Sequence, residues 1–173
     1  MRQRRVLSRR ETGENVILFT VGGFRFAISA AAVSEIRSME GLQRYFAGTA
    51  HKAAAKVIYT LERDGMIHFV VSAAQHFHLP PSRPDRVLIL RHMAAAFLVD
   101  STDRMTEISV LHALPLAFIG EERNWYRGLA IVNDEALPVV NPAAFLGRGE
   151  VAVLRAITDQ MQQMRQMQGA VVG

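Results

Sequence analysis

The sequence contains no cysteine, little charge and no long apolar run. The absence of cysteine among the 173 residues excludes disulfide scaffolds, thiolate metal sites and cysteine nucleophiles, and it suits a reducing, cytoplasmic location. Only 21% of the residues are charged and 50% are hydrophobic, which excludes an intrinsically disordered chain. No apolar run approaches the roughly 18 residues that a membrane helix needs, so we expect no membrane insertion and no export signal.

The net positive charge is concentrated at one end of the sequence. The formal net charge is +4, and the first ten residues contain no acid and five arginines, Arg2, Arg4, Arg5, Arg9 and Arg10. The rest of the chain has 15 basic and 16 acidic residues. We therefore expect residues 1–14 to be a basic, flexible arm. The alternative is an arm that binds nucleic acid or another anion, although no basic stripe elsewhere supports it.

Four hairpins are predicted, because β-branched and apolar runs flank short turns. The paired runs are 16–21 with 24–28, 57–61 with 66–71, 87–90 with 97–99, and 129–132 with 137–141. In the first hairpin Phe24, Phe26 and Ile28 alternate and should point into the core. The last two hairpins resemble the first two at offsets of 71 and 69 residues. Each half has too many strand edges to leave open, so we predict two small β-barrels packed together.

Two other segments have helical spacing. Residues 30–37 are expected to form a short helical turn with Val33 and Ile36 on one side. From Glu150 to Gln168 apolar residues recur at spacings of three and four, which predicts an amphipathic helix after a domain that spans residues 15–149. Such a helix docks on its own domain, or its methionines meet a partner groove or a second copy of the chain.

An ordered series of motifs carries a family resemblance over about residues 15–147. The motifs are 16–28 followed by Val33-Ser34-Glu35-Ile36-Arg37, then Phe97-Leu98-Val99-Asp100, 125–130 and 137–142. Together they resemble the CheW-like chemotaxis coupling proteins. The resemblance implies a mainly β fold of two pseudo-repeated, five-stranded SH3-like barrels with short helices. It also implies an adaptor that performs no catalysis and needs no cofactor.

The same resemblance implies partners and contact residues. The expected partners are the regulatory domain of a chemotaxis-type histidine kinase and the cytoplasmic tip of a chemoreceptor, in a bacterial chemosensory pathway. The expected contact residues are Val33, Glu35 and Ile36 in the first segment, and Arg63, Asp64 and Gly65 in the second hairpin. Without the resemblance, Val33 and Ile36 are equally consistent with core positions.

The second hairpin departs from the family pattern, which is usually glycine-x-isoleucine-asparagine-leucine-arginine-glycine. The ungapped match here is Tyr59-Thr60-Leu61-Glu62-Arg63-Asp64-Gly65, which puts the arginine one place early and an aspartate in its position. A displacement of one residue redirects the side chain, and the aspartate reverses the local charge. We therefore expect altered partner specificity.

Two remaining groups of residues have weaker interpretations. Trp125, Tyr126 and Arg127 are either a low-ranked partner contact or a loop anchor with its rings tucked inward. The pair His76 and His78 invites a metal hypothesis, but two histidines two apart point to different sides of a helix and no cysteine accompanies them, so we expect no metal site. The sequence has no phosphate loop, nucleophile elbow or dinucleotide fingerprint, and we expect that the protein is not an enzyme.

Overall fold

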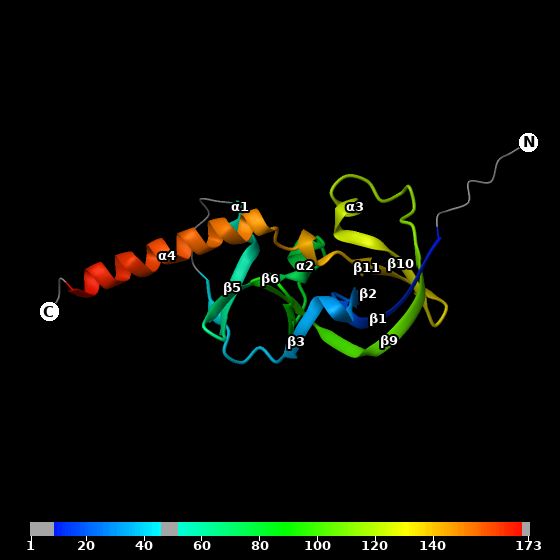
Figure 1. Cartoon of the computed structure of the whole chain (residues 1–173), viewed down its shortest axis with the longest axis horizontal. Helices are drawn as coiled ribbons and strands as arrows, with labels where there is room; N and C mark the ends of the chain where they lie inside the picture. The colour runs from blue at the N-terminus through cyan, green and yellow to red at the C-terminus, as the bar shows by residue number, and fades with distance from the viewer. Residues whose placement is uncertain (1–8, 46–51, 171–173) are drawn as a thin grey trace, which may run out of the picture.

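The computed structural model describes residues 9–45 and 52–170, and it contains two β-lobes from which one long helix extends (Figure 1). The first lobe is a closed barrel with the strand order β1-β2-β11-β10-β9. Its strands are β1 (Arg9–Val21), β2 (Phe24–Ser29), β9 (Ser101–His112), β10 (Tyr126–Val132) and β11 (Glu135–Val140). Strand β9 closes this barrel, because it pairs with β1 on one side and with β10 on the other.

The second lobe is a six-stranded sheet with the order β3-β7-β8-β6-β5-β4. Its strands are β3 (Val33–Arg37), β4 (Gln43–Arg44), β5 (Val57–Arg63), β6 (Met66–Ser72), β7 (Arg86–Leu90) and β8 (Ala95–Val99). Its antiparallel, parallel and antiparallel pairings through β7-β8-β6-β5 repeat those of β1-β2-β11-β10. Strands β3 and β4 therefore occupy together the place of β9, so this lobe is a five-stranded barrel with one interrupted strand.

The predicted fold class is confirmed, but the two halves of the sequence do not close separately. The first barrel combines β1 and β2 with three strands from the second half, and the second barrel contains the hairpin β7–β8. The reason is the parallel pair in each barrel, because it joins strands from different halves: Val139 lies opposite Ala27, and Val70 lies opposite Ala96. The two repeats thus exchange hairpins, and neither barrel can form from one half alone.

Aromatic rings fill the space between the barrels. The Phe19 ring lies 5.5 Å from Phe26 of the same barrel and 5.6 Å from Phe97 of the second. Phe97 in turn stacks on Phe145 with 4.2 Å between ring centroids. Phe77, which ends the short helix α2 (Ala73–His76), stacks on Phe26 at 4.7 Å. Because these rings belong to both barrels and to the segment before the last helix, the lobes share one core.

The alternation predicted for the first hairpin holds at two of its three positions. Phe26 and Ile28 are buried, but the Phe24 side chain is exposed. Phe24 stands at the first position after the turn, where Gly22 and Gly23 both have positive φ angles of 57° and 82°. It therefore lies at the rim of the barrel, beyond the layer of side chains that fills the interior.

The helical turn predicted over residues 30–37 is wrong. Only Ala30–Ala32 form a 3-10 turn, η1, and the chain then continues as strand β3, in which Ile36 pairs with Leu88 and Arg37 with Val87. The spacing of three that fits a helix has no such meaning in this strand, because β3 has a register shift between Val33 and Glu35. In the structure Val33 is 6% exposed and belongs to the core, whereas Ile36 is 40% exposed.

Both ends of the described chain extend beyond their predicted bounds. Strand β1 begins at Arg9, and Arg9 pairs with His112. Residues 9–14 were expected to belong to the flexible arm but are strand. The rest of the expected arm, residues 1–8, lies outside the described residues. The last helix, α4 (Arg148–Ala170), begins two residues before the predicted start. None of the described helices is long and apolar enough to cross a membrane.

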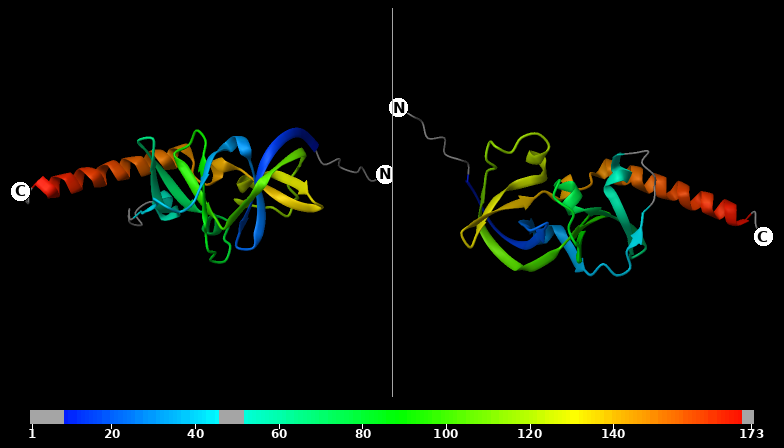
Figure 2. Two further views of the ribbon diagram at one scale, coloured as in Figure 1. Left: turned by 90° about the horizontal axis from the view of Figure 1, so that it is seen from below. Right: turned by 180° about the vertical axis from the view of Figure 1, so that it is seen from behind.

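The first part of α4 docks on the second barrel, and the rest projects from the body. Val151 and Leu154 are buried, and Lys56 at the end of α1 (Lys52–Lys56) donates to Glu150 Oε1 at 2.9 Å. From residue 162 to residue 170 every position is exposed. All views show this end of the helix extending past the barrels, on the side opposite to the N-terminal strand (Figures 1 and 2).

We predict that Gly128→Val destabilises the protein by about 1–3 kcal/mol, because it overpacks the closure of the first barrel. A Cβ atom at Gly128 would lie 2.4 Å from the backbone oxygen of His112 and 2.8 Å from the Cγ of Leu111. Urea unfolding measures the effect. Gly149→Val is the control, since no atom lies within 4 Å of its Cβ position. Equal losses in the two variants would contradict this account.

Candidate functional site

The two segments with expected partner contacts lie against each other at the seam between β3 and β5. Arg63, the last residue of β5, places its Nε 3.1 Å from Glu35 Oε2, and its Nη1 donates to Ser34 Oγ at 3.0 Å. Ser34 Oγ donates to the carbonyl of Ile89 at 3.2 Å. Strands β3 and β5 are not hydrogen-bonded neighbours in the sheet. Side chains therefore close the second barrel at this seam, where β9 closes the first with backbone hydrogen bonds.

The turn after Arg63 determines where the side chains of Arg63 and Asp64 lie. Asp64 and Gly65 both have positive φ angles, 51° and 73°, and they form the two-residue turn between β5 and β6. Arg63 is therefore a strand residue whose guanidinium points to the seam, while the Asp64 side chain is 87% exposed at the tip of the hairpin. The surface at this tip is acidic, although Asp64 Oδ2 remains 3.5 Å from Arg63 Nε.

The six expected contact residues fall into three structural roles. Glu35, Arg63 and Asp64 form one ion-pair cluster, which Arg37 joins with its Nε 3.6 Å from Glu35 Oε1. Ile36 is exposed, one position beyond Glu35 on β3. Gly65 is exposed in the turn, and Val33 is a core residue. The structure thus joins Glu35, Arg63 and Asp64 in one cluster with Gly65 in the adjoining turn, whereas the Ile36 side chain alternates to the other face of β3 and Val33 is buried.

A cavity of about 380 Å³ adjoins the seam, and we call it the cationic groove. Its lining residues come from β3, β5, β6, β7, the two hairpin turns and α4: Ser34, Arg63, Asp64, Met66, His68, Leu90, Arg91, His92, Met93, Ala94 and Arg155. Arg91 is fixed by donating to the carbonyl oxygens of Ala31 and Val33, each at 3.1 Å. The groove therefore has three guanidinium groups and one carboxylate.

His68 lines the cationic groove as a buried neutral group. Burial lowers its pKa; a hydrogen bond with the Met66 carbonyl opposes this, and the positive charges of Arg63 and Arg155 lower the pKa further. The Nδ1 of His68 lies 3.3 Å from the Met66 carbonyl oxygen. His68 therefore adds no positive charge to the groove at neutral pH.

Trp125, Tyr126 and Arg127 lie outside the cationic groove, where α3 (Glu122–Trp125) meets β10. The Tyr126 ring stacks on Phe77 at 5.7 Å, and burial, with the nearby Glu122 carboxylate, raises the pKa of its hydroxyl to about 12. Arg127 Nη2 lies 3.0 Å from Glu14 Oε1. Both rings pack against the shared core and Arg127 is paired within the chain, which favours the anchor interpretation over the partner contact.

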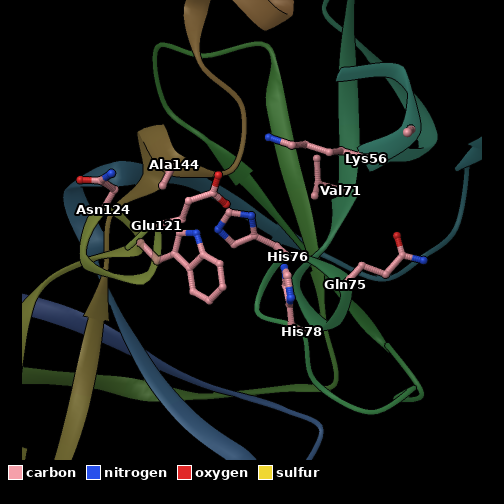
Figure 3. Close-up of a pocket in the computed structure, with 10 residues that line it drawn as sticks. Lys56, Val71, Gln75, His76, His78, Glu121, Asn124 and Ala144 are labelled. Atoms are coloured by element: carbon pink, nitrogen blue, oxygen red, sulfur yellow. The ribbon is translucent and has the colours of Figure 1, made fainter. Parts of the chain in front are cut away.

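A second cavity, of about 490 Å³, lies at the junction of the two barrels (Figure 3). Lys56, His76 and Glu121 point into it from three different elements. The Nε2 of His76 is buried without a hydrogen-bond partner, and the ring lies 5.2 Å from Trp125. Burial, followed by the charge of Lys56, lowers the pKa of His76 to about 4. The histidine is therefore neutral at physiological pH.

His76 and His78 do not assemble a metal site with their neighbours. Within residues 9–45 and 52–170 no group of three or more histidine, cysteine, aspartate or glutamate side chains could hold a metal ion. Both rings instead lie close to Trp125, with ring centroids 5.2 and 5.5 Å from its own. Their arrangement is that of packing residues around an indole.

The fold and this surface define a small β-barrel scaffold domain, and comparisons with known proteins identify its family. Residues 15–150 match the model of the CheW-like domain, so the chain belongs to the CheW-like family of chemotaxis adaptor and scaffold domains. The structure is similar to the crystal structure of the scaffolding protein TtCheW from Thermoanaerobacter tengcongensis. The TM-score is 0.65 over 80% of this chain and 96% of that chain, at 13% identity, which shows a common fold. No curated protein matches the sequence.

Four contributors to these sites escaped the sequence analysis. Ser34 anchors the seam, Arg91 and Arg155 line the cationic groove, and Lys56 holds α4 through Glu150. Burial alone would raise the pKa of Glu150, but the Lys56 ammonium and the Gly147 N–H lower it below its usual value. Ser34 stands inside a recognised motif. Arg91 and Lys56 instead make hydrogen bonds across 58 or more residues, and Arg155 reaches the groove from the last helix, so the sequence has no local signal for these three.

We predict that acid weakens the fold through His76. Its pKa is about 4 in the folded protein and near the ordinary 6.5 when unfolded, so the unfolded state binds more protons between these values. The contribution of His76 to the free energy of unfolding should be present above pH 6.5 and fall by roughly 1–2 kcal/mol by about pH 5. This range is reduced to allow for the partial exposure of the ring.

Urea unfolding between about pH 7.5 and pH 5 tests this prediction, with His76→Gln as the comparison. The variant should lose part of the pH dependence and keep the smaller part that comes from His68, whose pKa is also lowered. A pH profile that is the same in the variant and the natural chain would refute the assignment.

Proposed function

We propose that this chain is a cytoplasmic, non-enzymatic adaptor that couples a chemotaxis-type histidine kinase to chemoreceptors. The observation that carries the proposal is the convergence of β3 and the β5–β6 turn, the two segments expected to contact partners. They meet where Arg63 contacts Glu35 and also donates a hydrogen bond to Ser34, 29 residues earlier in the chain. Family membership supports the adaptor role, and the exposed surface at this seam supplies a place for the contact.

The seam has the composition of a small protein interface. The exposed Ile36 side chain offers apolar area on β3, next in sequence to Glu35, whose carboxylate pairs with Arg63. Interfaces typically combine an apolar centre with a polar rim, and arginine is enriched in them. We assign the regulatory domain of the kinase to this surface. The cytoplasmic tip of a chemoreceptor is the second proposed partner.

We further propose that partner specificity differs from that of typical family members. Arg63 is held by Glu35 and Ser34 within the chain, so its guanidinium is not presented at the hairpin tip. The tip presents the Asp64 carboxylate instead. A partner surface that is acidic at this point would meet like charge, which selects against it by repulsion.

We predict that Ile36→Asp weakens binding of the regulatory domain of the cognate kinase by at least about tenfold, because it places a charge in the apolar part of the interface. Calorimetric titration of the purified full chain measures the effect. The matched control is Ile131→Asp, since Ile131 is also an exposed isoleucine, 53% against 40% for Ile36, on β10 of the other barrel. The proposal fails if the natural chain does not bind the kinase domain, or if both variants weaken it alike.

The projecting end of α4 leads us to propose a second copy of the chain as a further partner. Met164 and Met167 are 57% and 70% exposed on a segment that has Arg165 as its one charged residue from 160 to 170. Two unsupported helical turns are marginal in water, so pairing with the same helix of a second molecule would stabilise them. Methionine side chains adapt well to such helix contacts.

We predict that the double variant Met164→Lys, Met167→Lys sediments as a monomer at concentrations where the natural chain forms dimers. The charges would disrupt the apolar pairing face without touching Leu154, which anchors the helix to the body. Gln163→Lys with Gln166→Lys adds the same charge on the neighbouring exposed face and should leave the dimer intact. A natural chain that stays monomeric at about 100 μM, near the upper range of transient association, would refute self-association.

A further inference from the structure

The cationic groove concentrates positive charge that the chain itself leaves largely uncompensated. Arg63, Arg91 and Arg155 approach it from β5, from the turn after β7 and from α4, and Asp64 is the one carboxylate in its lining. Arg63 is balanced by Glu35. Arg91 is held by carbonyl oxygens, which fix its direction without neutralising its charge.

Arg155 supplies the charge that is free to pair with another molecule. It lies on the docked part of α4, one position after the fully buried Leu154, so the helix holds it in place. Within the described part of the chain Arg155 makes no ion pair and no side-chain hydrogen bond. A guanidinium presents up to five donors, and carboxylates satisfy them in pairs. Arg155 is exposed, so its donors are available to exchange water for a carboxylate, and together with the unneutralised charge of Arg91 they favour an anionic partner group.

The rest of the lining favours a peptide over a longer polyanion. Met66, Leu90 and Met93 give the groove an apolar component, which suits a segment that has both acidic and aliphatic side chains. The volume of about 380 Å³ is near the lower end of typical ligand sites and has room for a few side chains. Asp64 at the edge and Glu35 behind Arg63 would repel a continuous run of phosphates.

We infer that the cationic groove binds a short acidic segment of a protein partner, with Arg91 and Arg155 receiving one or two Asp or Glu carboxylates while the aliphatic neighbours contact Met66 and Met93. This inference deepens the proposed function and rests on it for the identity of the partner, because the groove shares Ser34, Arg63 and Asp64 with the seam. The acidic segment then enters between the hairpin turns, and Asp64 limits its length.

A minimal peptide tests the chemistry without any assumption about the partner. The probe is the capped pentapeptide Ala-Glu-Leu-Glu-Ala, titrated into the isotopically labelled full chain and followed by the amide signals of each residue. We expect saturable shifts at Ser34, His92 and Arg155, and a loss of most of the shift with Ala-Gln-Leu-Gln-Ala, which has the same shape without charge. Equal shifts with the two peptides, or shifts elsewhere only, would overturn the inference.

Two charge reversals on the same helix separate a local site from general attraction. Arg155→Glu should weaken binding of the acidic peptide by about fivefold or more, because the electrostatic attraction in the groove becomes repulsion. Arg148→Glu makes the same change at an exposed position outside the groove and should have little effect. Urea unfolding confirms that each variant is folded. Equal weakening by the two reversals would show long-range charge alone and would refute the site.

Two further arms make the outcome specific. If hexathymidylate shifts the groove signals more strongly than the acidic peptide does, the site is a nucleic-acid site and the inference fails. If the acidic peptide binds but the kinase domain does not, the groove chemistry stands and the proposed kinase partner falls. If the kinase domain binds with unchanged affinity to Arg155→Glu and the peptide does not bind, the adaptor proposal stands and the groove inference falls.

Discussion

Each β-sheet in this protein has to close on itself, and the way in which each closes determines the rest of the structure. An open edge leaves a row of unpaired backbone donors and acceptors, which attracts other strands. The first barrel closes with the long strand β9, which pairs on both sides. In the second barrel β3 and β4 share that task, and the remaining gap is bridged by Arg63, Glu35 and Ser34. In the second barrel, closure by side chains places charged and polar side chains at the surface of the seam. Closure by backbone hydrogen bonds, as at β9, does not require such side chains.

The shared core couples this closure to the whole chain. Hairpins are exchanged between the two halves, so neither barrel has a complete hydrophobic interior until both are assembled. Phe19, Phe97 and Phe145 form a continuous aromatic contact from the first barrel to the segment before α4. Leu154 then extends the same core into α4. The orientation of the seam relative to the helix is consequently fixed by burial, and Arg155 reaches the groove because Leu154 beside it is buried.

Local chemistry explains which parts of this fold could be predicted from the sequence. The hairpins follow from glycine, asparagine and aspartate in two-residue turns, and positive φ at Gly22, Gly23, Asn133 and Asp134 confirms the reasoning. The helix α4 follows from the spacing of its apolar residues. The prediction for residues 30–37 was wrong because the spacing of three between Val33 and Ile36 fits a helix, whereas the pairing with β7 that makes residues 33–37 a strand is not a local property.

The exchange of hairpins and the composition of the site could not be predicted from local sequence patterns, because both depend on contacts between residues far apart in the chain. A parallel pair such as Ala27 with Val139 joins residues that are 112 apart in the chain, and no turn signal specifies it. The family resemblance located the two expected contact segments, but it could not show that Val33 is buried whereas Ile36 is exposed. Arg91 and Arg155 were invisible as site residues because each is unremarkable in its own hairpin or helix. Tertiary packing alone turns them toward one groove.

The displaced arginine connects barrel closure with recognition. In a two-residue turn the strand ends one position before Asp64, so an arginine at position 63 can reach across to β3. Its salt bridge is about two-thirds buried, which makes it more than a solvated surface pair but leaves it short of a deeply buried one. A residue that closes the barrel is not free to change direction for a partner. The arginines that remain available to a partner, Arg91 and Arg155, therefore lie in the adjacent groove. The tip of the hairpin exposes the Asp64 carboxylate instead. Recognition at this seam would then depend on a partner whose charges alternate over the distance between the tip and the groove, a pattern that a uniformly acidic or uniformly basic surface does not have.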